Sequence, residues 1–120
     1  MSGLIPPKIQ GAAELTERLG EWPDFHDAEI LEIRLHREEP SWLQIQLPRI
    51  SSGGSATVTF TLEGVSDLEL ADFNSQNVIS SLDIAPQPAS FRLTLFPCFG
   101  VAGFIEAEQI RVSYQSEAPK

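Results

Sequence analysis

The residues with the greatest capacity for chemistry are His26 and Asp27, because an imidazole next to a carboxylate can bind a metal ion or move a proton. Metal-dependent phosphohydrolases use such a pair, but only with further His and Asp ligands. Here the only other histidine is His36 and the only cysteine is Cys98, so Cys and His side chains cannot complete a zinc site. We expect a structural role, with Asp27 accepting backbone N–H groups and His26 filling a half-polar niche. The alternative is a small metal-dependent hydrolase centred on the pair.

Other catalytic patterns are missing from the sequence. No Gly-x-Ser-x-Gly elbow occurs, and the glycines match neither a dinucleotide fingerprint nor a phosphate loop. Cys98 follows a proline and has no neighbouring base, so we expect it to be a small buried hydrophobe. The sequence therefore predicts a protein that is not an enzyme and needs no cofactor or metal.

A second group of polar residues lies in the middle of the chain, where Asp67, Glu69, Asp72 and Asn74 fall within eight positions. Four oxygen side chains could bind calcium, but their spacing does not match an EF-hand loop. A solvated acidic strand edge is the alternative we prefer, because carboxylates on an edge also block edge-to-edge aggregation.

The charge of the chain is strongly negative and unevenly distributed. Eight basic and seventeen acidic residues give a net charge of −9, and no Lys or Arg lies between Arg49 and Arg92. An acidic surface repels nucleic-acid phosphates and anionic lipid and favours encounter with a basic protein. The simpler alternative is that the charge only maintains solubility.

Apolar periodicity predicts one helix followed by strands. Leu15 and Leu19 lie four apart before Gly20, which indicates a short helix over 12–19. Period-2 alternation predicts strands at 29–37, 42–47, 57–62, 67–70, 78–84, 91–95 and 104–114, with loops at 51–55 and 97–103. The fold class is α+β, mainly β: an antiparallel sheet or two-layer sandwich-like arrangement of short strands with one short N-terminal helix.

The length of 120 residues predicts a single domain. We expect a flexible N-terminal arm over 1–10, a β-rich domain over 11–115 and a tail over 116–120. No secretion signal or membrane-spanning run is present, so a cytoplasmic location is expected. Trp22 and Phe25 are predicted to pin the corner between the helix and the first strand. The predicted core is Leu31, Ile33, Leu43, Ile45, Val58, Phe60, Phe91 and Leu93.

Three stretches resemble segments of the immunity protein 50 family of bacterial polymorphic-toxin systems. They are WPDFHDAEI at 22–30, EGVSDLELADFNSQNVI at 63–79 and FGVAGF at 99–104, in the family's order. The likeness covers about residues 20 to 114. The first stretch is the most specific, since it places Trp22 and Phe25 just before the His26–Asp27 pair. Pro97 and Cys98 depart from the smaller or polar residues expected before the glycine turn.

The resemblance implies a bacterial protein that is made beside a toxin, binds it and blocks it inside the producing cell, without catalysis. An acidic surface would speed docking to a basic toxin such as a nuclease. We take Asp67, Glu69 and Asp72 as candidate contacts, and Trp22, Phe25, His26 and Asp27 as structural family-motif residues. A housekeeping interaction module or a homodimer is a further alternative. Nucleic acid and membrane are not expected as partners.

Overall fold

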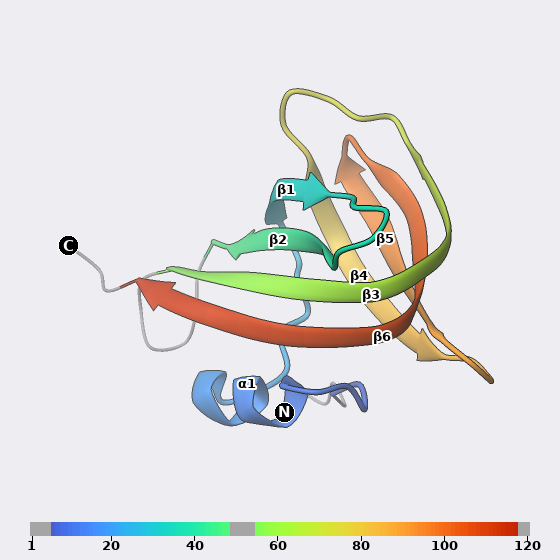
Figure 1. The fold of residues 1–120 in the computed structure, drawn as a ribbon. Helices are drawn as coiled ribbons and strands as arrows, with labels where there is room; N and C mark the ends of the chain where they lie inside the picture. Colours follow the sequence, from blue (N-terminus) through green and yellow to red (C-terminus); the bar gives the residue numbers. More distant parts are fainter. Residues whose placement is uncertain (1–5, 49–54, 118–120) are drawn as a thin grey trace.

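The computed structural model describes residues 6–48 and 55–117 and contains one helix and six strands in these ranges (Figure 1). Most of the predicted loop at 51–55 lies outside the described residues. The elements are α1 (Ala12–Leu19), β1 (Ala28–Arg34), β2 (Ser41–Leu47), β3 (Ser55–Ala71), β4 (Val78–Pro86), β5 (Phe91–Phe99) and β6 (Ala102–Glu117).

The six strands form a closed antiparallel barrel in the order β1-β2-β3-β6-β5-β4. The prediction of an antiparallel, mainly β fold with one short N-terminal helix is confirmed. A short ladder between β1 and β4, which pairs Ala28 with Ile79 and Glu29 with Val78, closes the ring. Closure removes most of the edges that an open sheet would expose.

Two strands are much longer than the alternation predicted. β3 has 17 residues and β6 has 16, and they pair along nearly their full lengths while curving together around the barrel (Figure 1). The predicted segments 57–62 and 67–70 are therefore parts of one strand. Gly64 has a φ of 68° and the register shifts between Val65 and Asp67, so the strand bends there without ending.

The first half of β3 pairs with both β2 and β6, whereas its second half pairs with β6 alone. In the register of the first half with β2, Leu43 lies opposite Phe60 and Ile45 opposite Val58. These four side chains are fully buried, as the period-2 pattern predicted.

Most of the predicted core is confirmed, with one error in β1. Ile33 and Phe91 are partly buried against the core, but Leu31 is 48% exposed. The cause is a bulge: Ile30 pairs with Ile45 and Glu32 with Gln44, so Leu31 has no partner in β2. An extra residue in a strand reverses the alternation beyond it, and a period-2 pattern cannot reveal it.

The helix packs against β6 with Leu15 and Leu19 buried. It ends as predicted at Gly20, which has a φ of 89° and whose N–H bonds to the carbonyl of Thr16 at 2.8 Å. Just before the helix, Gln10, which falls within the predicted arm, forms a parallel bridge to Arg111 of β6. No helix in the described part of the chain combines the length and apolarity needed to cross a bilayer.

Two aromatic side chains fix the segment between α1 and β1, as predicted. Trp22 and Phe25 are buried and meet edge to face, with ring centroids 5.8 Å apart. Both also contact Phe60 of β3, at 6.4 and 5.9 Å. This aromatic cluster anchors the segment to the barrel interior.

Candidate functional site

His26 and Asp27 lie at the surface just before β1, with side chains 65% and 61% exposed. The His26 Nε2 and Asp27 Oδ2 atoms are 3.6 Å apart. The expected niche for His26 is absent, and the acceptor of the turn is Asp24, whose Oδ1 accepts the backbone N–H of His26 at 2.9 Å. Asp27 contributes through its backbone: its N–H donates to the carbonyl of Ile79 at 2.9 Å and its φ is 63°. The pair shapes the entry into β1.

No group of three His, Cys, Asp or Glu side chains in the described residues could hold a metal ion. A hollow of about 210 Å³ near this loop includes Asp24 and Asp83, but neither His26 nor Asp27 lines it. The proposed calcium ligand Asn74 instead uses its Oδ1 within its own turn, where it accepts the N–H of Ser75 at 2.8 Å.

The candidate contacts Asp67, Glu69 and Asp72, which we call the acidic edge, are all exposed along the second half of β3 and just after it. Asp67 and Glu69 alternate with Leu68 and Leu70 and therefore point to the opposite face. None of the three carboxylates pairs with a cationic side chain among the described residues. The structure thus leaves these charges available to a partner.

The cation nearest in register to the acidic edge is already engaged. Asp67 lies opposite Glu106 in β6, and Glu106 lies opposite Arg92 in β5. Arg92 Nη2 is 2.7 Å from Glu106 Oε2, and its guanidinium stacks 4.0 Å from the centroid of Phe104. Arg92 is therefore engaged by Glu106 and Phe104, and it forms no ion pair with the carboxylates of the acidic edge.

The second half of β3 also has an open side. The β2–β3 ladder ends where Ser41 pairs with Leu62, so residues 63–71, which we call the open edge, pair with β6 only. Leu68 shows the effect: it lies opposite the fully buried Ile105, yet it is 37% exposed. Solvent reaches this inward-facing side chain because no described strand pairs with the other side of β3 in this segment.

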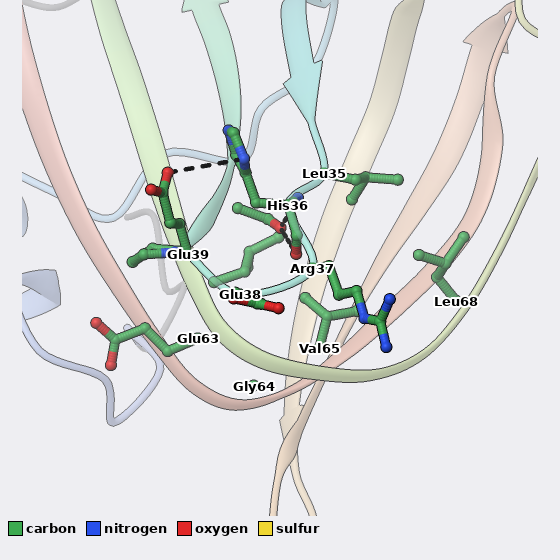
Figure 2. Close-up of a pocket in the computed structure, with 12 residues that line it drawn as sticks. Leu35, His36, Arg37, Glu38, Glu39, Glu63, Gly64, Val65 and Leu68 are labelled. Atoms are coloured by element: carbon green, nitrogen blue, oxygen red, sulfur yellow. Dashed lines mark hydrogen bonds and ion pairs between the residues drawn. The ribbon is translucent and has the colours of Figure 1, made fainter.

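A groove of about 640 Å³ lies beside this edge, between β3 and the turn that joins β1 to β2. Figure 2 shows Val65 and Leu68 on the β3 side, facing Leu35 and Arg37 from the turn. His36 organises the turn. Its backbone N–H donates to Ser41 Oγ at 2.9 Å, and its ring Nδ1 is 3.8 Å from Glu39 Oε1.

Several exposed apolar residues escaped the sequence reasoning. Leu35 continued a predicted inward-facing pattern, but β1 ends at Arg34 and Leu35 lines the groove. Phe73, Phe96 and Phe99 are also exposed. The sequence signals for this exposure were weak: Phe73 follows Asp72, Phe96 precedes Pro97 and Phe99 precedes Gly100. Exposure depends on which strands are neighbours, and the sequence does not show that directly.

Cys98 is exposed, contrary to the prediction that it is buried. The reason is that Pro97 does not end β5: the strand continues to Phe99, and Pro97 pairs with Ile79 at a register shift. Bulges are among the positions where a sheet tolerates proline. The turn before β6 therefore occupies only residues 100–101, which is shorter than the predicted loop at 97–103.

The comparisons with known proteins leave the resemblance to the immunity protein 50 family as a prediction. No family model, no curated protein and no solved structure matches this chain.

Proposed function

We propose that this protein is an immunity-type binding protein, which neutralises a basic bacterial toxin inside the cell that makes both and catalyses no reaction. The observation that carries the proposal is the acidic edge, where three exposed carboxylates have no cationic partner among the described residues. Uncompensated like charges raise the association rate with a cationic partner and suppress wrong partners.

The positions of His26 and Asp27 support the hydrolase alternative less than the acidic edge supports the binding function. His26 and Asp27 are exposed at the rim of a turn, and no described third ligand joins them. A metal hydrolase needs converging ligands and a shielded substrate position. The acidic edge, by contrast, lies beside exposed apolar side chains, and this combination is typical of protein interfaces.

The choice of a toxin as the partner comes from the resemblance of residues 22–30, 63–79 and 99–104 to the immunity protein 50 family. A nuclease toxin must attract phosphates and is therefore basic near its active site. An acidic protein that docks there would compete with the nucleic acid for the same surface.

Co-expression in bacteria with a toxin domain encoded beside this gene tests the proposal. We expect cells to survive when the protein is present, and to lose protection with the isosteric variant Asp67→Asn/Glu69→Gln/Asp72→Asn. The control neutralises the same number of charges at other exposed positions, with Glu14→Gln/Glu17→Gln/Glu21→Gln. Undiminished killing with the unaltered protein would overturn the proposal.

A further inference from the structure

We infer that the open edge of β3 receives an extended segment of a cationic protein partner, which joins the barrel as an additional strand. The inference rests on the proposed function for the existence of that partner, and it adds the mode of binding. Four features carry it: unpaired backbone, an asymmetry between two strand edges, an adjoining groove and the sign of the charge.

The first feature is the backbone of residues 63–71. A strand directs its N–H and C=O groups alternately to its two sides. One side of this segment pairs with β6, from Glu63 opposite Gln109 to Ala71 opposite Ala102, and the described residues provide no partner for the other side. An edge of this kind is a template for another chain.

The second feature is that the molecule covers the corresponding edge of β6 but not that of β3. β5 pairs with β6 only as far as Ala107, so the later residues of β6 would present a similar free side. There the segment before α1 adds a bridge between Gln10 and Arg111, and the N–H of Val112 donates to the Gln10 carbonyl at 2.9 Å. Within the described residues, no segment does this for β3.

The third feature is space of the right kind. The groove of about 640 Å³ runs beside residues 62–68 of β3, and the turn between β1 and β2 forms its far wall (Figure 2). Leu35, Val65 and Leu68 give it apolar contacts, which could receive every second side chain of an added strand. Backbone pairing supplies affinity in such complexes, and side-chain pockets supply specificity.

The fourth feature is the charge, which selects the occupant. The groove lining carries Glu38 and Glu39 against the guanidinium of Arg37, while Glu63 is paired with Arg111 Nη2 at 2.9 Å. The acidic edge, which has no such pairing, continues the negative charge along β3. Two copies of this chain paired edge to edge would bring Asp67 and Glu69 near their own counterparts. Like charges placed opposite each other across strands are destabilising. A cationic strand would instead place opposite charges across from these carboxylates, which is stabilising.

Peptide binding tests the inference directly. The probe is an alternating lysine–valine peptide with blocked ends, about eight residues long to match the open edge. Two controls have the same length: one carries N-methyl groups on alternate backbone amides, and the other has glutamate in place of lysine. Binding is measured by fluorescence anisotropy, and its location by amide hydrogen exchange across the whole protein.

We expect the lysine peptide to bind and to slow exchange at alternate amides of residues 63–71. N-methylation should weaken binding by about tenfold or more, since it removes hydrogen-bond donors without altering charge. The glutamate peptide should not bind. Equal binding of the N-methylated peptide, protection confined to other strands, or self-association through β3 would each overturn the inference.

Variants of the protein separate charge from apolar contact. Asp67→Lys/Glu69→Lys should weaken binding of the lysine peptide by about tenfold or more, whereas Glu14→Lys/Glu17→Lys on α1, with the same change in net charge, should alter it by less than about threefold. Leu68→Ser should weaken binding at constant charge. Circular dichroism checks folding, and Asp67→Asn/Glu69→Gln replaces the reversal if that variant is unfolded.

The outcome is distinguishable from failure of the proposed function. If co-expression protects cells from the toxin, but toxin binding slows no amide exchange at residues 63–71, the function stands and strand addition is wrong. If the lysine peptide pairs with β3 but no neighbouring toxin is neutralised, the strand-binding edge stands and the toxin assignment is wrong.

Discussion

Gly103 of β6 and Glu69 of β3 approach so closely that a β-carbon on the glycine would overlap the Glu69 carbonyl oxygen. The two residues lie in adjacent positions of the β3–β6 ladder, where Gly103 pairs with Leu70 and Glu69 with Phe104. Gly103 also has a φ of 139°, which side chains rarely adopt. This contact supports the strand segment that carries the acidic edge.

Gly103→Ala should therefore destabilise the protein by about 3 kcal/mol or more, because it combines backbone strain with overlap against a neighbouring strand. Gly20→Ala is the control: Gly20 also has a positive φ, 89°, but it is exposed at the end of α1. Strain alone should cost about 1 kcal/mol there. Urea unfolding measures both free energies, and equal losses would show that the close approach contributes nothing.

The aromatic cluster should dominate the stability of the barrel interior. Phe60→Ala removes the ring that contacts both Trp22 and Phe25, and a loss of about 3–5 kcal/mol is expected from the cavity it leaves. Phe73→Ala removes a ring that is 58% exposed and should cost less than about 0.5 kcal/mol. Urea unfolding followed by tryptophan fluorescence measures the difference, and similar midpoints would contradict the assignment of the core.

The extent to which the sequence predicted this fold depended on how local each signal was. Alternation identified the buried face of β2 and of the first half of β3, because the period-2 pattern is a property of neighbouring residues. It failed at Leu31, where a bulge shifts the register, and at Gly64 and Pro97, which bend or shift strands without ending them. Glycine and proline mark irregularity, but the pairing partner decides whether the strand continues.

The candidate site was predictable only in part for the same reason. Exposure of Asp67 and Glu69 followed from their alternation with Leu68 and Leu70. The open edge and the groove beside Leu35 did not, since both arise because β2 begins only at Ser41 and the β2–β3 ladder therefore ends at Leu62. That ending depends on strand order, which residues distant in sequence determine together.

Substitutions in the turn before β1 test whether His26 and Asp27 have a structural or a catalytic role. Asp27 has a φ of 63°, so Asp27→Val should destabilise the protein by about 1–2 kcal/mol, whereas Asp27→Gly should not. Asp24→Ala should cost about 0.5–1 kcal/mol through loss of the bond from the His26 N–H. Urea unfolding measures each.

The double variant His26→Ala/Asp27→Asn tests whether these two side chains are needed for function. It should retain full protection against the toxin, because neither side chain belongs to the proposed binding surface. Loss of protection in a folded double variant, together with bound divalent metal in the unaltered protein, would favour the hydrolase alternative.

Asn77 links the loop after the acidic edge to the turn between β5 and β6. Its Oδ1 accepts the N–H of Asn74 at 3.1 Å and that of Val101 at 2.9 Å, and its Nδ2 donates to the Asn74 carbonyl at 3.0 Å. A β-carbon on Gly100 would overlap the same Oδ1, so a glycine is needed for this link. One side chain thereby holds together two loops that are distant in sequence.

Asn77→Ala should destabilise the protein by about 1–3 kcal/mol, because the buried residue Val101 loses the acceptor for its N–H. Asn77→Asp is the matched control: it keeps an oxygen for both N–H groups, although it places a charged oxygen instead of a donor opposite the Asn74 carbonyl. Hydrogen exchange gives the site-specific measurement, since the Val101 amide should exchange faster in Asn77→Ala than in Asn77→Asp. Equal protection of that amide in the two variants would mean that the loops are held by other contacts.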